Sequence, residues 1–152
     1  MGLCAALTAV ATMVIKFPTP ATQGYINVGD TVIFVSALLF GPSVGAVAGG
    51  IGSALADLLG GYVHWVPFTL IIKGVEGWLV GRLARSVSQR RWVVPILILG
   101  GGWMVIGYFI VEMLIYGWGA AVVEIPGNLV QAGVSLLIAL PLTAALRKLR
   151  QE

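Results

Sequence analysis

Hydrophobic positions along the chain form six long apolar runs, and polar or turn-forming residues separate them. Proline and glycine mark most of the breaks, because proline cannot continue a helix from its interior and Gly-Pro pairs are typical of turns. The pattern predicts six helices, over residues 2–16, 30–40, 43–60, 67–85, 92–116 and 126–147. We expect a loop at 17–29, a turn at 117–124, and an interruption or kink of the last helix at Pro141.

The second apolar run, 30–40, is too short to cross a bilayer alone, since it extends only about 17 Å as a helix. It must tilt, extend backwards through Val28 and Gly29, or lie beside a loop at membrane depth. The preceding segment, 17–29, is long for a connection in a chain with so little other loop, and it carries Gln23, Tyr25 and Asn27. A long loop with hydrogen-bonding side chains is typical of a lid or a pocket wall.

Composition assigns these helices to a membrane. The chain of 152 residues is 59% hydrophobic and only 10% charged, whereas a soluble domain has about 25% charged residues. Spans of about 20 residues fit six times into this length. The sequence therefore predicts an all-α polytopic membrane protein with one integral domain, 1–152. With Cys4 as its single cysteine, it predicts neither a disulfide framework nor a metal site, and it suggests no cofactor.

The net charge of +3 could indicate nucleic-acid binding, but the basic residues argue against that function. They form two clusters that flank apolar helices: Arg82, Arg85, Arg90 and Arg91, and then Arg147, Lys148 and Arg150. Such clusters are typical of cytoplasmic membrane flanks. With six helices, both termini should be cytoplasmic. The first 15 residues resemble a signal-peptide core but lack a basic leader, and we interpret them as a retained first helix.

Small residues predict where helices approach one another. Gly45, Gly49, Ser53 and Asp57 recur every four residues, so the 43–60 helix should be central and closely packed. Ala5 and Ala9 form a smaller stripe on the first helix. That stripe could receive a helix of another subunit, or it could pack inside the chain.

The ionisable side chains within apolar runs all fall in the outer half of this topology, and the inner half has no acid before Glu152. Intramembrane ionisable residues usually face a cavity or a partner and mark a function. The candidate ligand-binding residues are Tyr25, Asn27, Trp65, Lys73, Glu76, Glu112, Tyr116, Asn128 and Gln131. Polar groups among them would bind a planar ligand, and the aromatic ones, with Trp118, would stack on it.

Each candidate also has a structural interpretation. Lys73 and Glu76, three residues apart, could neutralise each other. Asp30 could cap its helix, and Asp57 could pair within the fold. Asn128 and Gln131 could tie helices together. The aromatic residues could be interfacial anchors, namely Trp65 with His64, and Tyr116 with Trp118.

Four stretches together resemble a known family: Asn27-Val28-Gly29-Asp30, Gly41-Pro42-x-x-Gly45-Ala46, the run from Gly49 to Asp57, and the run from Thr69 to Gly74. The chain resembles the substrate-binding S component of energy-coupling factor (ECF) vitamin transporters of the riboflavin and hydroxymethylpyrimidine type. The resemblance covers essentially the whole length, although the first helix is short and lacks the basic leader of many members, which suggests a trimmed N-terminus.

The resemblance implies a six-helix subunit of a bacterial or archaeal cell membrane that captures a vitamin or its precursor from outside with high affinity. It implies assembly with a transmembrane coupling subunit and two cytoplasmic ATPases, with small residues on the first helix, here Ala5 and Ala9, contacting the coupling subunit. The loop after that helix, together with helices four to six, would form the pocket. The resemblance does not identify the vitamin.

Two other function classes stay open at this point. A membrane enzyme could use Asp57, His64 and Glu112 for acid–base or metal chemistry, but a single histidine makes a conventional zinc site hard to build. A structural membrane protein without a ligand is the other alternative. The chain contains no Walker A, HExxH or GxSxG pattern, so it should not hydrolyse ATP, and energy for transport would come from a partner.

Overall fold

The structure, a computed structural model, describes residues 1–87 and 89–149, so the predicted basic residue Arg150 and the acid Glu152 lie outside the described residues. The described chain is all-α apart from one small hairpin. Its elements are α1 (Gly2–Val14), β1 (Lys16–Thr19), β2 (Gly24–Asn27), α2 (Gly29–Phe40), α3 (Pro42–Val47), η1 (Ala48–Gly52), α4 (Ser53–Gly60), α5 (Val66–Ser86), η2 (Arg90–Trp92), α6 (Val93–Tyr116) and α7 (Trp118–Leu149). The segments α3, η1 and α4 follow one another directly, as the sequence predicted for 43–60.

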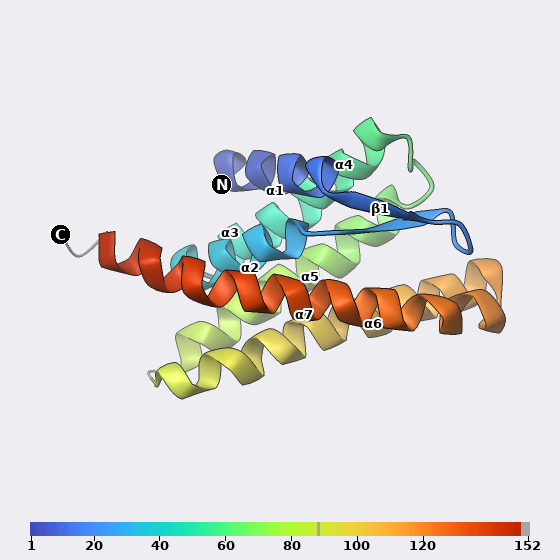
Figure 1. Cartoon of the computed structure of the whole chain (residues 1–152). Coiled ribbons are helices and arrows are strands. Elements are labelled where there is room, and N and C mark those ends of the chain that lie inside the picture. Colours follow the sequence, from blue (N-terminus) through green and yellow to red (C-terminus); the bar gives the residue numbers. More distant parts are fainter. Residues whose placement is uncertain (88, 150–152) are drawn as a thin grey trace.

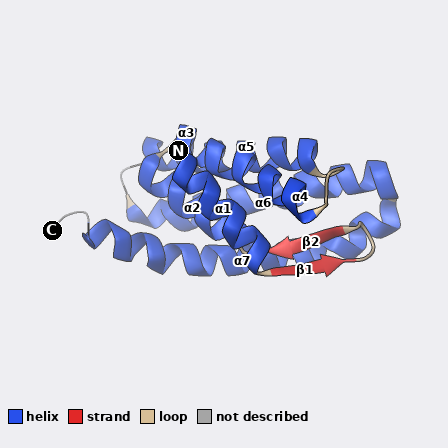
Figure 2. Ribbon diagram, turned by 90° about the horizontal axis from the view of Figure 1, so that it is seen from above, coloured by secondary structure: helices blue, strands red, loops and turns tan. Residues whose placement is uncertain are grey.

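The helices run back and forth in one bundle, with α6 and α7 as its longest members (Figure 1). The tip of the hairpin and the α6–α7 turn lie at one end of the molecule in both views (Figure 2). The C-terminal end of α7 and the connection from α5 to α6 lie at the other end. We call these the hairpin end and the basic end.

Arginines from both basic clusters meet at the basic end. Arg85 on α5 donates a hydrogen bond to the carbonyl of Phe40 at 2.9 Å, and Arg147 on α7 donates one to the carbonyl of Leu38 at 3.1 Å. Both carbonyls belong to the last turn of α2, which leaves its final C=O groups without helical partners. The two clusters predicted to share one side of a membrane therefore lie side by side in the fold.

The segment predicted as a loop, 17–29, is in part a β-hairpin. Strands β1 and β2 are antiparallel, with Lys16 opposite Asn27 and Thr19 opposite Gly24. The hairpin continues from α1 and leads into α2, both of which are short: 13 and 12 residues. Pairing satisfies backbone groups that lipid could not satisfy. The prediction of a loop beside a short helix was right about the location and wrong about the local structure.

The predicted turn at 117–124 is also wrong. Only Gly117 separates α6 from α7, and its positive φ of 86° makes the reversal possible. Helix α7 then runs for 32 residues through both Pro126 and Pro141. Proline disfavours helical geometry in the residue before it, which suggested a helix start at Pro126. Packing of the first turns, where Ala121 and Glu124 are buried, outweighs that local preference.

Close contact between α3–η1 and α5 explains the glycines of the central helix. A Cβ on Gly45 would overlap the backbone carbonyl of Gly77, and one on Gly77 would overlap the carbonyl of Gly45. Gly49 meets the carbonyl of Lys73 in the same way. The prediction of a central, closely packed helix is confirmed. The π-helical turn η1 lies at this contact, and such turns are frequent at functional sites.

Three helical stretches are long and apolar enough to cross a membrane: Pro42–Gly60, Val93–Tyr116 and Trp118–Leu149. Helices α1 and α2 are apolar but shorter. Large apolar side chains such as Leu114, Leu137 and Leu59 are exposed on the outside of the bundle, which suits contact with lipid. The apolar core, built around Phe34, Val80 and Leu97, fills the half toward the basic end, and the buried ionisable groups lie in the other half.

Candidate functional site: a polar cavity beneath the hairpin

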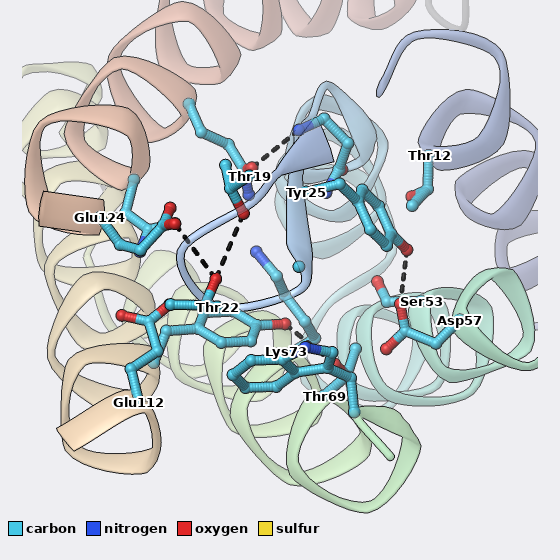
Figure 3. A pocket seen from close by; sticks show the side chains of 16 residues that line it. Thr12, Thr19, Thr22, Tyr25, Ser53, Asp57, Thr69, Lys73, Glu112 and Glu124 are labelled. Carbon is cyan, nitrogen blue, oxygen red and sulfur yellow. Dashed lines mark hydrogen bonds between the residues drawn. The ribbon is translucent and has the colours of Figure 1, made fainter. Parts of the chain in front are cut away.

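A polar cavity of about 40 Å³ lies between the hairpin and helices α4 to α7 (Figure 3). Its wall consists of Thr12, Thr19, Thr22, Gly24, Tyr25, Asn27, Ser53, Asp57, Trp65, Thr69, Lys73, Tyr108, Glu112, Glu124, Asn128 and Gln131. The hairpin and helices α1, α4, α5, α6 and α7 contribute to it. This is the region where the sequence predicted a pocket under the segment that follows the first helix.

Lys73 is the charged residue at the centre of a buried network. Its ammonium group donates a hydrogen bond to Asp30 Oδ1 and forms an ion pair with Glu76 Oε2 at 3.2 Å. All three side chains are at most 2% exposed. The sequence had offered Glu76 as one possible partner of Lys73; the structure adds Asp30, 43 positions away in the chain.

Gln131 links this network to the hairpin. Its amide nitrogen donates to Asp30 Oδ2 at 2.8 Å, and its amide oxygen accepts the backbone N–H of Asn27 at 2.8 Å. The side chain of Asn27 in turn accepts the backbone N–H of Gly29 at 2.8 Å. A continuous chain of hydrogen bonds therefore runs from the ion pairs on α5 through α2 and α7 to the base of the hairpin.

Two further contacts fasten the hairpin over the cavity. The Tyr25 hydroxyl donates to Asp57 Oδ1 on α4 at 2.5 Å, and the Thr22 hydroxyl donates to Glu124 Oε1 on α7 at 3.1 Å. The phenol acts as the donor, because an ionised carboxyl group can only accept hydrogen bonds. The Tyr25 ring also packs on Tyr62, with ring centroids 4.6 Å apart.

Aromatic side chains form another part of the wall. Trp65 is only 4% exposed and meets Tyr108 edge to face, with centroids 5.8 Å apart. The Tyr108 hydroxyl shares a hydrogen bond with Thr69 at 3.1 Å. Lys73 lies 5.7 Å from the centroid of the Tyr108 ring. A flat ligand next to this group would find ring faces and edges as well as polar atoms.

Several buried polar atoms of the wall have no hydrogen-bond partner among the described residues. They are Asp57 Oδ2, Glu112 Oε2, Trp65 Nε1 and Thr12 Oγ1. Leaving such groups unsatisfied costs about 1–3 kcal/mol each. These four atoms are available to form hydrogen bonds with a molecule that enters the cavity.

The structure brings seven of the nine predicted ligand residues to the cavity: Tyr25, Asn27, Trp65, Lys73, Glu112, Asn128 and Gln131. Glu76 forms an ion pair with Lys73 but does not line the cavity. Tyr116 shares a hydrogen bond with His64 at 3.1 Å outside the lining. Trp118 is 66% exposed and packs on Phe109, as expected for an interfacial aromatic residue.

Sequence reasoning missed part of the wall. The threonines Thr12, Thr19, Thr22 and Thr69, with Ser53 and Tyr108, gave no signal, because a hydroxyl in an apolar run bonds its own helix as readily as a ligand. From the sequence, Asp57 was considered as a residue that pairs within the fold, and neither Asp57 nor Glu124 was chosen as a ligand residue. The available signal was their place near the ends of apolar runs, in a chain that has only six acidic residues.

Ala5 and Ala9 face the inside of the bundle. They are 5% and 8% exposed, and a Cβ on Gly52 of η1 would meet the backbone of Ala5 within 3.2 Å. These side chains are therefore covered by the chain itself in this conformation, which favours the internal-packing alternative over a direct contact with another subunit. The outer face of α1 carries Leu3, Leu7, Val10 and Val14 instead.

Comparison with known proteins identifies the family. Residues 1–148 match the family described as "ECF-type riboflavin transporter, S component". The chain belongs to this family. As an S component it is a membrane-embedded subunit of a transporter, in agreement with the resemblance carried by the region 27–74.

Three relatives illustrate the similarity. An uncharacterised protein of Pyrococcus woesei is 46% identical over 129 residues, which cover 85% of this chain and 86% of that protein. The "Thiamine precursor transporter HmpT" of Lactococcus lactis is 34% identical over 143 residues, covering 91% of this chain and 80% of the relative. A UPF0397 protein of Streptococcus pneumoniae is 36% identical over 87 residues, 57% of this chain and 47% of its own length.

Proposed function

We propose that this S component captures a small vitamin or vitamin precursor of the riboflavin or hydroxymethylpyrimidine type in the cavity beneath the hairpin. The observation that carries the proposal is the cluster of buried, unpartnered polar atoms beside Trp65 and Tyr108. Ligand sites combine apolar and aromatic walls with a few placed polar groups. The family and the relative named a thiamine precursor transporter support this substrate range.

Binding requires the hairpin to move. The cavity of about 40 Å³ holds little more than a water molecule, whereas sites for small organic ligands have about 300–1,000 Å³. The hydrogen bonds that hold the hairpin down are few, namely Thr22 to Glu124, Tyr25 to Asp57 and Asn27 to Gln131. A ligand that replaces some of these hydrogen bonds can open the hairpin and then be enclosed by it.

We propose that the hairpin end faces outward and the basic end faces the cytoplasm, with six passes and both termini inside. The meeting of Arg85 and Arg147 at the last turn of α2 supports this orientation, because lysine and arginine are enriched on cytoplasmic flanks. The cavity then opens toward the external substrate. The short helices α1 and α2 complete their passes with the hairpin.

Transport needs partners, which we propose to be a transmembrane coupling subunit and two cytoplasmic ATPases, because the chain has no nucleotide-binding pattern of its own. An apolar groove of about 580 Å³ between α1, α2 and α7 offers the coupling subunit a surface. It is lined by Cys4, Leu7, Val10, Ala11, Val14, Ile15, Val28, Val32, Val35, Ser36, Leu39, Phe40, Leu142 and Leu146. In this proposal Ala5 and Ala9 hold α1 close to η1 and so shape the groove rather than enter it.

Calorimetric titration of the purified protein in detergent tests the proposal. We expect riboflavin or hydroxymethylpyrimidine to bind one molecule per chain, and mass spectrometry of protein from cells to find such a compound co-purified. Thr12→Val, which removes an unpartnered hydroxyl of the cavity, should weaken binding. Thr143→Val removes an equally buried, unpartnered hydroxyl outside the lining and should leave the affinity unchanged. Absence of binding by both compounds, with nothing co-purified, would contradict the proposed function.

A further inference from the structure

The charges of the cavity wall are unbalanced. Three carboxyl groups belong to the lining, those of Asp57, Glu112 and Glu124. Lys73 is the cation among the described lining residues, and Asp30 and Glu76 already take up its charge. Lys16 lies outside the lining, 5.4 Å from the centroid of the Tyr62 ring. Whatever binds therefore meets a wall on which acidic groups exceed available basic ones.

The unpartnered atoms of the wall include carboxyl oxygens, which accept hydrogen bonds. Asp57 Oδ2 on α4 and Glu112 Oε2 on α6 accept no hydrogen bond from the described residues. The two residues lie on opposite sides of the cavity in the close-up (Figure 3). The other two unpartnered groups of the wall are the indole N–H of Trp65 and the hydroxyl of Thr12. A matching ligand donates hydrogen bonds at two separated points and accepts one at the aromatic side.

We propose that the cavity selects an uncharged or cationic nitrogen heterocycle with at least two hydrogen-bond donors, and that it rejects the phosphate ester of the same compound. This inference rests on the proposed function and deepens it. Amino and hydroxymethyl groups on a flat ring supply donors of this kind. A phosphate supplies acceptors and negative charge only.

The rejection follows from electrostatics in a buried site. Phosphates are bound by arginine forks, lysines or sets of backbone N–H groups. Here the phosphate would face Asp57, Glu112 and Glu124, and could reach Lys73 only by separating it from Asp30 and Glu76. Like charges brought together in an interface are strongly unfavourable. Specificity therefore comes from repulsion as well as from fitting hydrogen bonds.

Matched pairs of compounds test the inference. Calorimetric titrations would compare riboflavin with its 5′-phosphate, and hydroxymethylpyrimidine with its monophosphate, on the same purified protein. We expect at least one parent compound to bind and its ester to bind at least ~100-fold more weakly. A parent that binds while its ester binds within tenfold would overturn the selection against phosphate and leave the proposed function standing. Failure of both parents to bind would instead overturn the proposed function.

Variants show whether the carboxyl groups cause the selection. Glu112→Gln and Asp57→Asn keep the shape of the wall and remove one negative charge each. Each variant should bind the parent compound more weakly. The ratio of its affinity for the parent to its affinity for the ester should fall by tenfold or more. Arg82→Gln alters an exposed charge outside the lining and should change neither affinity. If both variants still bind the parent compound and prefer it to its ester as strongly as the unchanged protein does, the carboxyl groups do not cause the selection.

Discussion

Replacing Lys73 by methionine tests the buried charge network that supports the cavity. The substitution replaces lysine by an unbranched side chain that is one atom shorter. It leaves Asp30 and Glu76, 1% and 0% exposed, without a cation. Breaking a buried ion pair by removing one partner costs about 3–5 kcal/mol. For a chain of this size each kcal/mol lowers the melting temperature by about 2–4 °C. We therefore expect Lys73→Met to melt about 6–20 °C lower.

Thermal unfolding in detergent, followed by circular dichroism, measures this effect. Lys16→Met is a matched control, because the ammonium group of Lys16 lies over the faces of Tyr25 and Tyr62 and should contribute about 1 kcal/mol or less. Adding Asp30→Asn and Glu76→Gln to Lys73→Met removes the uncompensated charges and should restore most of the stability. A melting temperature for Lys73→Met no lower than that of Lys16→Met, or no recovery in the triple variant, would refute the network.

The remaining predictions concern packing and topology. Gly77→Ala should destabilise the protein strongly, because the new Cβ would overlap the carbonyl of Gly45 on the facing helix. In Gly102→Ala the new Cβ meets nothing within 4 Å, so this variant should be tolerated. Equal melting temperatures of the two variants would contradict the described helix contact. In a Cys4→Ala background, cysteine at Gln23 should react with an impermeant reagent added outside whole cells, and cysteine at Gln89 should react only after the membrane is opened. Labelling of position 89 from outside would reverse the proposed orientation.

Much of the fold could be predicted because it follows from local pattern. Long apolar runs, proline and glycine breaks, and the four-residue spacing of Gly45 and Gly49 each act over a few residues, and they located the six helical segments. The hairpin could not be predicted this way. Its strands have only four residues each, and β1 contains Pro18. They pair because they bridge two short helices over a cavity. Helix α7 likewise starts before Pro126 for a tertiary reason.

The candidate site could be predicted in its location and in part of its membership. Polar residues are rare in the apolar helices of a membrane protein and usually have a function there. Lys73, Glu112 and Gln131 could therefore be chosen from the sequence. Their partners were not, since Gln131 reaches Asp30 across 101 positions and Thr22 reaches Glu124 across 102. Pairings at such separations depend on how helices are rotated in the bundle, and a single sequence holds no local signal for that.

The central claim is that the ligand binds beneath the hairpin, next to Trp65, and fluorescence of single-tryptophan proteins tests it most directly. One protein would keep Trp65 alone, and its control would keep only Trp92 of η2, 47% exposed at the basic end. The titrant is riboflavin or hydroxymethylpyrimidine, whichever calorimetry shows to bind. We predict that its saturating addition changes the emission of Trp65 far more than that of Trp92. Calorimetric binding with an unchanged Trp65 emission, or with the larger change at Trp92, would contradict the claim.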